Sequence, residues 1–410
     1  MLQCKTKWKR KKLDSICNYI TTGKLDANAM VEGGEYRFYT CAENHYKIDT
    51  YAFEGQSLLI SGNGANVGYI HYYNGKFNAY QRTYVLQNFD ENIFYIKHYL
   101  KAYLKDRIAK EVNAGNIPFI KLNTLTDMNI QYPESKDEQQ KIADILSTCD
   151  EVIEKTEETI EKYKQIKAGL MQDLFTRGLD ENGTLRPTYT QAPDLYKYSK
   201  ELDRHIPKEW DVKPMELVVK RIGDIDHYMP KSVEDGIPYI MTGDFIGNND
   251  LDFKNAKKIS ITDHETLSKK IKPEFNDIII ARYATVGTIR IVKTNKPFLV
   301  SYSCAIIKTD RNLINPDYLA YYIKSDFCQN LMDLEINAST QKNIGIDTLK
   351  TISVFVPQYS KEQDDIVKTL NAIETKIEIE EQYLNKYKQI KQGLMKRLLT
   401  PPADAEIVEE

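Results

Sequence analysis

The amino-acid sequence predicts an α+β protein that arose by internal duplication. We expect two similar globular domains, each a twisted β-sheet with short helices, joined by two long antiparallel coiled-coil helices related by a pseudo-two-fold axis. Three observations lead to this prediction. They are a repeat with a period of about 200 residues, a helical apolar spacing in two matching segments, and short β-rich runs in the remaining chain.

The repeat is clearest in one phrase, KYKQIKAGLM at residues 162–171, which returns as KYKQIKQGLM at residues 386–395. Over residues 162–176, 11 of 15 residues are identical to those 224 positions later, whereas unrelated segments agree at about one position in fifteen. Toward the amino terminus the offset drifts to 202, where Trp8 pairs with Trp210. Loop insertions in the second copy explain this drift, so the chain contains two copies of one unit.

Each copy ends in a segment with the apolar spacing of a long helix. In residues 142–174 and 366–398, apolar side chains recur mostly three or four positions apart, as in a coiled-coil seam. Capping boxes precede both segments, and Gly178 and the pair Pro401-Pro402 follow them. Each helix should therefore contain about 40 residues and be roughly 60 Å long. Two unrelated surface helices are the alternative, but the matching length, seam and register favour an intramolecular antiparallel pair.

Gly169 and Gly393 lie at equivalent places inside these helices. A glycine inside a helix costs about 0.5–1 kcal/mol relative to alanine. Close approach by another backbone would explain why both copies carry this cost. Drift that was copied with the duplication explains it equally well.

The globular parts, residues 1–132 and 210–356, have a different pattern. Their β-rich runs alternate with Gly, Asn and Asp and include SLLISG (57–62), YVLQ (84–87), DIIIAR (277–282) and CAIIK (304–308). Each part then has one short helical segment, at 92–105 and at 315–332. A linker rich in glycine and proline, residues 179–209, separates the copies.

Composition places the chain among ordinary globular proteins. Apolar residues make up 41% and charged residues 28% of its 410 positions, and no run of 18 apolar residues could form a membrane span. The basic start has no apolar stretch of a secretory signal, and six cysteines without CxxC spacing favour free thiols in a cytosolic protein over disulfides or zinc.

The net charge of −3 hides an uneven distribution. Acidic residues concentrate in residues 134–161, 358–385 and 403–410, and the rest of the chain has 50 Lys and Arg residues and 38 Asp and Glu residues. Basic globular parts of this kind are compatible with nucleic-acid binding.

Four features together identify a resemblance. They are the duplication itself, GIPYIMTGDFIG (236–247) followed by NDIIIARYATVGTIRIV (276–292), NASTQKNIGIDTLKTISVFVPQYSKEQ (337–363), and GLMQDLFTRGLDENGTLRP (169–187) running on to IPKEW (206–210). Over essentially its whole length the chain resembles the specificity subunit of type I restriction–modification systems. The first copy departs from the pattern, because it has NAGNIPFIKLNTL where the second has NASTQKNIGIDTL and no IPKEW precedes Trp8.

The resemblance implies a division of the chain into target-recognition domain 1 (1–132), spacer helix 1 (133–178), linker (179–209), target-recognition domain 2 (210–356), spacer helix 2 (357–400) and an acidic tail (401–410). Each recognition domain would read one half of a split site in double-stranded DNA. Two methyltransferase subunits would dock on the helices, and restriction/translocase subunits would complete a cytoplasmic host-defence complex. S-adenosylmethionine, ATP and Mg would belong to those partners, with no cofactor in this chain.

The implied partner contacts are the exposed and apolar positions of the repeated phrase: Tyr163, Ile166, Gly169, Leu170, Met171, Tyr387, Ile390, Gly393, Leu394 and Met395.

Two segments imitate catalytic motifs, but a simpler explanation accounts for each. Asn315-Pro316-Asp317-Tyr318 resembles the catalytic turn of an adenine methyltransferase, yet proline in the first turn of a helix explains it. GNGANVG at 62–68 resembles a cofactor loop, but its spacing is not GxGxxG and no helical pattern follows it. The sequence also has no GxxxxGK[ST] motif and no nuclease-like carboxylate cluster, so we expect a non-catalytic chain.

Candidate DNA contacts are polar residues that can donate or accept hydrogen bonds at base edges and phosphates, placed in loops near strand ends. In the first copy they are Asn63, Asn66, Gln81, Arg82, Asn116 and Lys121. In the second copy they are Arg282, Tyr283, Thr285, Ser301, Tyr302, Ser303, Thr340, Gln341, Lys342 and Asn343. A solvated loop is the alternative for any one of them.

Two other functions remain open at this point. One is the specificity subunit of a type IIB-like enzyme, whose single partner both methylates and cuts DNA. The other, of a different class, is a coiled-coil scaffold with no DNA function.

Overall fold

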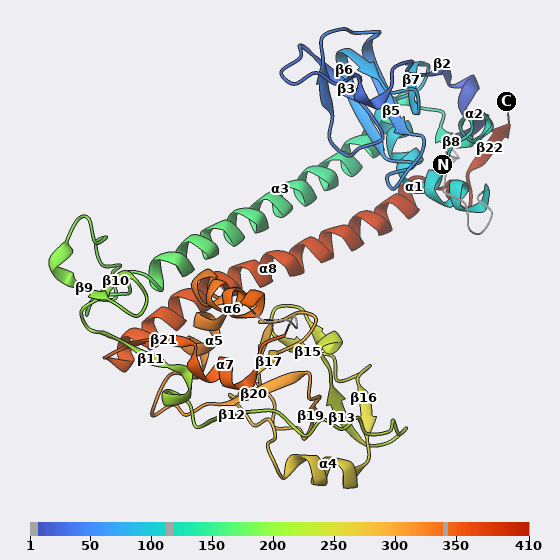
Figure 1. The fold of residues 1–410 in the computed structure, drawn as a ribbon. Helices are drawn as coiled ribbons and strands as arrows, with labels where there is room; N and C mark the ends of the chain where they lie inside the picture. The colour runs from blue at the N-terminus through green and yellow to red at the C-terminus, as the bar shows by residue number, and fades with distance from the viewer. Residues whose placement is uncertain (1–6, 112–118, 339–342, 410) are drawn as a thin grey trace, which may run out of the picture. The chain divides into compact units, whose positions relative to one another are not determined.

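The computed structural model describes residues 7–111, 119–338 and 343–409 (Figure 1). Asn116, Thr340, Gln341 and Lys342, four of the predicted DNA contacts, lie outside these ranges.

The chain forms two compact units that do not coincide with the two sequence copies. Unit 1 comprises Met1–Thr159 and Glu380–Glu410, and unit 2 comprises Ile160–Ile379. Each unit therefore contains one globular part, the first half of the long helix of its own copy, and the last half of the helix of the other copy.

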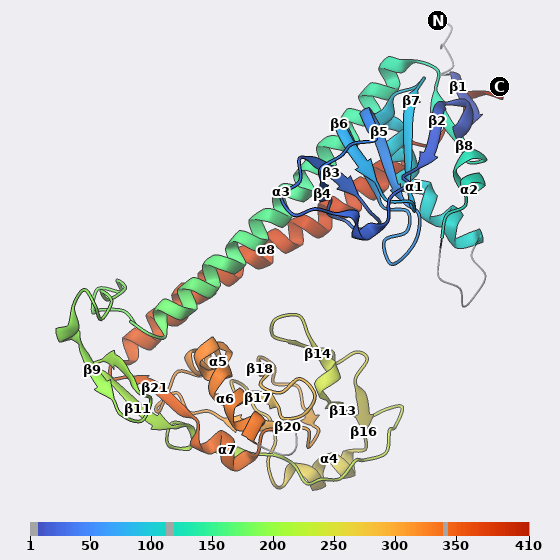
Figure 2. The same ribbon diagram turned by 45° about the horizontal axis from the view of Figure 1, so that its top comes forward.

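Unit 1 is built around a six-stranded sheet with the order β2-β7-β5-β6-β3-β4. The strands are β2 (Cys17–Thr22), β3 (Tyr36–Tyr39), β4 (Tyr46–Ile48), β5 (Phe53–Ser61), β6 (Ile70–Ala79) and β7 (Thr83–Phe89). All neighbouring pairs are antiparallel except β3 and β6. Figure 2 shows β2, β7, β5 and β6 side by side, so the predicted runs at 57–62 and 84–87 lie in adjacent strands.

A second sheet in unit 1 joins both ends of the described chain. Its strands, in the order β22-β1-β8, are β22 (Glu406–Glu409), β1 (Lys7–Lys12) and β8 (Asn129–Pro133). Helices α1 (Ile93–Glu111) and α2 (Leu122–Thr126) complete the unit. Helix α1 is longer than the predicted segment at 92–105.

The six-stranded sheet of unit 1 has apolar side chains on both faces. Successive residues of a strand point to opposite sides, and β5 contains the consecutive apolar residues 58–60. Leu58 and Ile60 of β5 belong to the main core, which also contains residues of α1 and Leu146 of the first long helix. Leu59 faces the other way, into a smaller cluster with Phe77. Full burial of such side chains contributes about 1.5–3 kcal/mol each.

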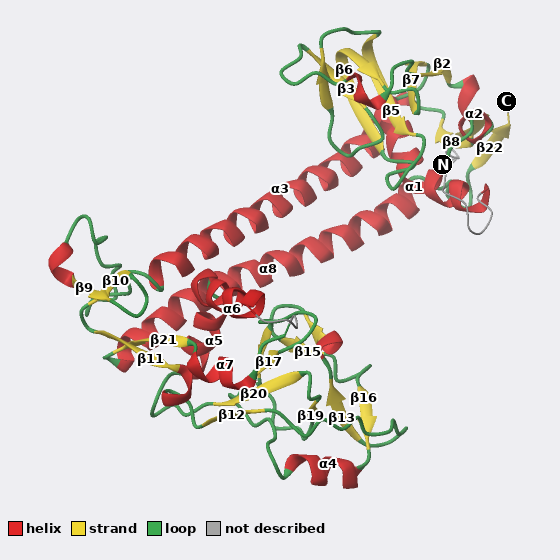
Figure 3. Ribbon diagram, in the orientation of Figure 1, coloured by secondary structure: helices red, strands yellow, loops and turns green. Residues whose placement is uncertain are grey.

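Unit 2 has shorter strands and more loops, as Figure 3 shows. Its four-stranded sheet has the order β12-β20-β17-β18 and its three-stranded sheet the order β16-β13-β19. The strands of unit 2 are β9 (Tyr196–Ser199), β10 (Arg204–Pro207), β11 (Trp210–Pro214), β12 (Arg221–Gly223), β13 (Ile237–Ile240), β14 (Phe245–Ile246), β15 (Asp250–Leu251), β16 (Lys257–Ile259), β17 (Ile278–Ala281), β18 (Ile289–Ile291), β19 (Leu299–Val300), β20 (Cys304–Lys308) and β21 (Ser353–Pro357). The predicted runs at 277–282 and 304–308 are β17 and β20, paired antiparallel.

The short helices of unit 2 are α4 (Ile261–Ser268), α5 (Pro316–Lys324), α6 (Asp326–Ala338) and α7 (Ile346–Thr351). The single helix predicted at 315–332 is wrong in one respect, because it is broken at Ser325. The Ser325 hydroxyl donates to the carbonyl of Tyr322 at 2.6 Å and accepts from the amide of Cys328 at 3.4 Å, so it ends one helix and caps the next. Its counterpart in α1 is Ala102, a strong helix former, and α1 is continuous.

The predicted long helices are α3 (Lys136–Leu174) and α8 (Ser360–Leu398), each of 39 residues and thus roughly 58 Å long. In unit 1, Lys391 and Lys388 of α8 pair with Asp150 and Glu157 of α3, respectively. The residue numbers run in opposite directions along the two helices, so these segments are antiparallel. None of the helices in the described ranges is long and apolar enough to cross a membrane.

In unit 2 the corresponding segments are also antiparallel. Lys167 pairs with Glu374, and the Nζ atom of Lys376 lies 5.9 Å from the ring centre of Tyr163. The predicted apolar seam is buried at Ile160 on α3 and at Ile377 on α8.

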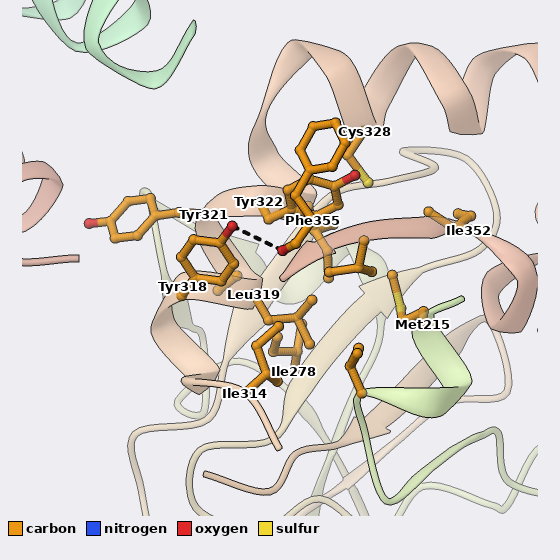
Figure 4. Packing of buried hydrophobic residues seen from close by; sticks show 14 of the residues in the cluster. Met215, Ile278, Ile314, Tyr318, Leu319, Tyr321, Tyr322, Cys328, Ile352 and Phe355 are labelled. Carbon is orange, nitrogen blue, oxygen red and sulfur yellow. Dashed lines mark hydrogen bonds between the residues drawn. The ribbon is translucent and has the colours of Figure 1, made fainter. Parts of the chain in front are cut away.

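The end of α3 packs into the main core of unit 2. Phe175, just beyond the helix, is 1% exposed, and its ring centre lies 5.4 Å from that of Tyr318 and 5.6 Å from that of Tyr322. Figure 4 shows this core, in which the Tyr318 hydroxyl donates to the carbonyl of Phe355 at 3.0 Å. The end of α8 packs in the same way into unit 1, where Leu399 is fully buried.

A buried ionic cluster holds the start of α8. The Glu362 carboxylate accepts hydrogen bonds from Arg186 at 2.6 Å and from Trp210 Nε1 at 3.0 Å. Gly178, which has φ +65°, leaves the space that this cluster needs, because a Cβ atom there would lie 2.3 Å from Glu362 Oε1. In unit 1 the equivalent Trp8 Nε1 is buried without a hydrogen-bond partner within the described chain.

Candidate nucleic-acid interface and partner face

Three polar stretches of unit 1 meet at one end of the six-stranded sheet. The amide of Gly62, after β5, donates to the carbonyl of Arg82 at 2.8 Å, and the amide of Ile120 donates to the carbonyl of Gly62 at 2.8 Å. The β5–β6 loop, the β6–β7 turn and the segment before α2 are thereby held together. The predicted set of Asn63, Arg82 and Lys121 therefore occupies neighbouring loops.

Unit 2 repeats this arrangement with the same backbone hydrogen bonds. The amide of Arg282, after β17, donates to the carbonyl of Ser303 at 2.8 Å, and the amide of Ile344 donates to the carbonyl of Arg282 at 3.2 Å. The loops at 282–288, 301–303 and 343–345 are thus equivalent to those of unit 1. The duplication has preserved a loop cluster as well as the helices.

One glycine closes the first loop of each cluster. The amide of Gly68 donates to the carbonyl of Ser61 at 2.8 Å, and the amide of Gly287 donates to the carbonyl of Ala281 at 3.0 Å. Both have positive φ, +80° and +82°, which explains why the pair Val-Gly occurs in both copies. The segment at 62–68 joins two strands, so it lacks the helix amino terminus on which a phosphate loop depends.

The side chains of the unit 1 cluster differ in exposure. Gln81, Arg82 and Lys121 are exposed, whereas Asn63 and Asn66 are half-buried. Asn66 donates to the carbonyl of Cys41 at 3.2 Å. Within the described ranges the guanidinium of Arg82 has no carboxylate partner, so it is available to a ligand.

Two predicted contacts of unit 2 are buried. Arg282 is 7% exposed, donates to the carbonyl of Ile344 at 2.9 Å, and forms an ion pair with Asp224. Ser301 is 1% exposed, and its hydroxyl contacts that of Ser303. Both residues therefore support the loops in this conformation, and we do not retain them as base contacts.

Of the remaining predicted contacts in this cluster, Thr285 is exposed, and the half-buried ones are Tyr283, Tyr302, Ser303 and Asn343.

The ion pair at Arg282 belongs to a larger charged group that sequence reasoning missed. Burial raises the pKa of Asp224, but the hydrogen bond and charge of Lys270 and the charge of Arg282 outweigh it and lower this pKa overall. His227 stacks on Tyr302 with ring centres 5.0 Å apart and approaches Asp224 at 3.4 Å. The signal that could have found it is IGDIDHYM at 222–229, where two acids and a histidine follow β12.

Unit 1 carries an aromatic group beside its loop cluster that was also missed. Tyr69 follows the 62–68 loop, is 38% exposed, and lies with its ring centre 4.7 Å from that of His71. The ring centre of His71 lies 5.1 Å from that of Tyr39, and His71 in the tautomer protonated at Nε2 donates to the carbonyl of Ala42 at 3.0 Å. Burial lowers the pKa of His71, which keeps the imidazole neutral near pH 7. Within the described ranges no group of three or more His, Cys, Asp or Glu residues could bind a metal ion.

The Asn-Pro-Asp-Tyr segment is a helix start, as the sequence indicated. The Asn315 side chain accepts from the amide of Asp317 at 2.9 Å and from that of Tyr318 at 3.3 Å, and Pro316 is in the first turn of α5. The side chains that a methyltransferase motif would offer to a substrate are occupied in capping and packing.

The predicted partner contacts fall into two groups. Leu170 and Met171 pack against the core of unit 2, and Leu394 and Met395 pack against the core of unit 1. In the second group, Ile166 and Ile390 are exposed, with exposed fractions of 41% and 46%, and Tyr163 and Tyr387 are half-buried.

Gly169 and Gly393 lie on open helix faces. Apart from its chain neighbours and the backbone of its own helix, a Cβ atom at either position would have no heavy atom of the described residues within 4 Å. The close approach that these glycines suggested is therefore not made by the described residues of this chain. We call the helix faces around the two glycines, Tyr163–Met171 and Tyr387–Met395, the phrase faces.

The chain is similar in sequence to a family of known proteins. Residues 5–165 and 207–389 match the family described as "Type I restriction modification DNA specificity domain". The chain is 36% identical over 178 residues to the type I restriction enzyme EcoDI specificity subunit of Escherichia coli, an alignment that covers 43% of this chain and 38% of that protein. It is 25% identical over 372 residues to the putative MjaX specificity subunit of Methanocaldococcus jannaschii, covering 88% of this chain and 76% of that protein.

Among solved structures, the fold is similar to that of the type I restriction–modification S subunit from M. genitalium. The TM-score is 0.63 with 17% sequence identity, and the match covers 98% of this chain and 99% of that one. The predicted fold class, with its two copies and long helices, is confirmed.

Proposed function

The chain belongs to the family of type I restriction–modification specificity subunits, and from this premise we propose that it is the non-catalytic DNA-recognition subunit of such a system. Its target would be split, with one half read by each loop cluster. The observation that carries this proposal is the repeated set of backbone hydrogen bonds, through Gly62 and Arg82 in unit 1 and through Arg282 and Ser303 in unit 2. Two similar readers in one chain fit a target of two parts.

The chemistry of the two clusters supports different half-sites. Unit 1 offers Arg82, Gln81 and Lys121, whose forked or cationic donors suit guanine, adenine and phosphate, respectively. Unit 2 offers hydroxyl groups on Tyr302, Ser303 and Thr285, which can donate or accept. Because the two sets differ, the half-sites need not be related in sequence.

The phrase faces support docking of methyltransferase subunits. Exposed Ile166 and Ile390, each near an open glycine, provide apolar surface that a partner helix can approach closely. We propose one methyltransferase subunit for each face, with restriction subunits joining the complex. S-adenosylmethionine, ATP and Mg would be bound by those partners.

Sequencing the methylated bases of cells with and without this gene tests the proposal. We expect a split motif, with methylated adenine in both halves, that is present only when the gene and its methyltransferase partner are expressed together. The complex should copurify with a separate ATP-driven motor. A single fused nuclease–methyltransferase partner would instead indicate a type IIB-like enzyme. If cells that lack the gene keep every methylated motif, the chain would be a scaffold without DNA function.

A further inference from the structure

A cavity of about 380 Å³ lies in unit 2 between the end of α3 and the start of α6. Its apolar lining includes Met171, Phe175 and Phe327, and its charged lining consists of Arg204, Lys324 and Asp326. Ala168, next to the open Gly169, also lines it, so the cavity continues the phrase face of α3.

The break at Ser325 shapes this cavity. In unit 1 the equivalent helix is continuous, and the Tyr103 hydroxyl contacts the Thr400 hydroxyl at 3.2 Å. Tyr103 and Thr400 correspond to Asp326 and Thr176, which both line the cavity in unit 2. In unit 1 this contact joins α1 to the segment that follows α8, and in unit 2 a cavity lies at the equivalent place.

Within the part of the chain that the structure describes, the two cations of the cavity have no carboxylate partner. Arg204 lies with its Cζ atom 4.8 Å from the ring centre of Phe327, and burial lowers the pKa of its guanidinium. Lys324 donates to the carbonyl of Asn248 at 3.5 Å, and burial lowers its pKa as well. The charge of Glu374 raises the pKa of Lys324 against the effect of burial, but this carboxylate is already paired with Lys167 and accepts from the Tyr321 hydroxyl. No carboxylate in the described ranges forms an ion pair with Arg204 or Lys324.

Half-buried cations without a counter-charge are costly unless a ligand supplies the opposite charge. Arg204 and Lys324 outnumber Asp326, so the cavity has a net positive charge. The two partly exposed apolar side chains beside these cations, Met171 and Phe327, suit a ligand that combines a carboxylate with an apolar group. A phosphodiester has no apolar group for Met171 and Phe327 to cover.

We propose that this cavity receives an acidic side chain and an adjacent apolar side chain of the methyltransferase subunit docked on the α3 phrase face. The inference rests on the proposed function. It makes the two docking sites unequal for two reasons. The contact between Tyr103 and Thr400 occupies the equivalent place in unit 1. In addition, the hairpin β9–β10 that supplies Arg204 lies in the linker between the copies, which occurs once in the chain.

The test measures the affinity of the purified methyltransferase subunit for the full-length chain by titration calorimetry. The variants are Arg204→Gln, Lys324→Gln and their double variant, and the matched control is Lys296→Gln, which removes an exposed positive charge elsewhere in unit 2. We expect the double variant to lose about tenfold or more in affinity at one class of sites, with a smaller loss at high salt. The control should bind as the wild type does.

A second variant separates the cavity from its charges. Asn330→Trp fills the cavity and keeps both cations, and we expect it to weaken binding too, with a thermal unfolding midpoint near that of the wild type. Unchanged affinity in both the double variant and Asn330→Trp would overturn the inference while leaving the proposed function intact. If duplex DNA binding by the chain fell and methyltransferase binding did not, the occupant would be a phosphate, which also overturns it. A wild-type chain that bound no methyltransferase would overturn both proposals.

Discussion

Lys391, in the second copy of the repeated phrase, forms an ion pair with Asp150 on α3. The pair recurs in unit 2, where Lys167 of the first phrase pairs with Glu374, 224 positions after Asp150. The last lysine of each phrase thus binds an acid on the opposite helix. This explains why KYKQIK is repeated, because each copy fixes the register of the antiparallel helices in one unit.

We expect the Lys391–Asp150 pair to stabilise unit 1 by a measurable coupling energy. Their side chains are 16% and 27% exposed, so solvent screens the pair only in part. A double-mutant cycle with Lys391→Met and Asp150→Asn, followed by urea denaturation, should give a coupling of about 1–3 kcal/mol. Lys396→Met, at an exposed position of the same helix, should change stability little. Additive losses in the cycle would show that the pair does not fix the helices.

Stability should also depend on pH through His98, which is fully buried against Ser147. Burial is the main cause that lowers the pKa of His98 to about 3. The unfolded chain takes up this proton below about pH 6.5 and the folded chain does not, so stability falls as pH decreases from 6.5 toward 3. The loss should reach about 2 kcal/mol at pH 5.

The variant His98→Gln keeps a hydrogen-bonding group at this place but cannot titrate. Thermal unfolding at pH 7.5 and pH 5 should show a smaller difference in this variant than in the wild type. Some difference will remain because burial also lowers the pKa of His71 in the same unit. Burial raises the pKa of Asp150, but Lys391 and Lys101 outweigh this effect and lower the pKa overall. Asp150 therefore contributes to the pH dependence of stability only at more acidic pH. An equal pH dependence in variant and wild type would refute the role of His98.

Replacing the two helix glycines should separate stability from assembly. Gly169→Ala and Gly393→Ala should each stabilise the isolated chain by up to about 0.5–1 kcal/mol, because alanine favours helix and no heavy atom of the described residues obstructs its Cβ. If partner helices approach these faces closely, the same variants should bind the methyltransferase subunit more weakly. Gly178→Ala is the contrasting control and should destabilise strongly, since its Cβ would overlap Glu362. Full partner affinity in both helix variants would indicate that the glycines are inherited drift.

Arg82 should determine part of one half-site. Arg82→Gln keeps the backbone carbonyl that Gly62 contacts but removes the forked charge, so binding to the target should weaken by about 1–3 kcal/mol. Methylome sequencing should show relaxed specificity at one or two positions of a single half-site. The control Lys110→Gln removes an exposed charge from α1 and should leave the motif unchanged. An unaltered motif in Arg82→Gln would exclude this residue from base recognition.

Sequence patterns predicted the elements of this fold far better than the contacts of single side chains. The helices follow from apolar spacing and the loop clusters from equivalent offsets, both of which are local or repeated signals. The burial of Arg282 depends on Asp224, 58 residues away, and the cluster at Glu362 depends on Arg186, 176 residues away. Such pairs leave no periodic trace in one sequence. The helix break at Ser325 was recognisable only by comparison with Ala102.

The spacing between the half-sites provides the final prediction, in which the long helices act as a ruler. Four added residues lengthen a helix by about 6 Å, close to two base pairs at roughly 3.4 Å each. The ion pairs of Lys391 and Lys167 hold α3 and α8 in register within the two units, so an insertion near Thr156 requires a matching one near Glu380, 224 positions later. Since a tilt of the helices relative to the DNA reduces the gain, we expect the methylated motif to gain one or two base pairs between its halves.

Both half-site sequences should stay unchanged in the doubly lengthened protein, because no loop of either cluster is altered. A protein lengthened in α3 alone is the matched control. It should shift one of the two lysine–acid pairs out of register and lose stability, which thermal unfolding would detect. If the doubly lengthened protein folds, keeps its partners and still methylates sites of the original spacing, then the helices do not set the distance between the two readers.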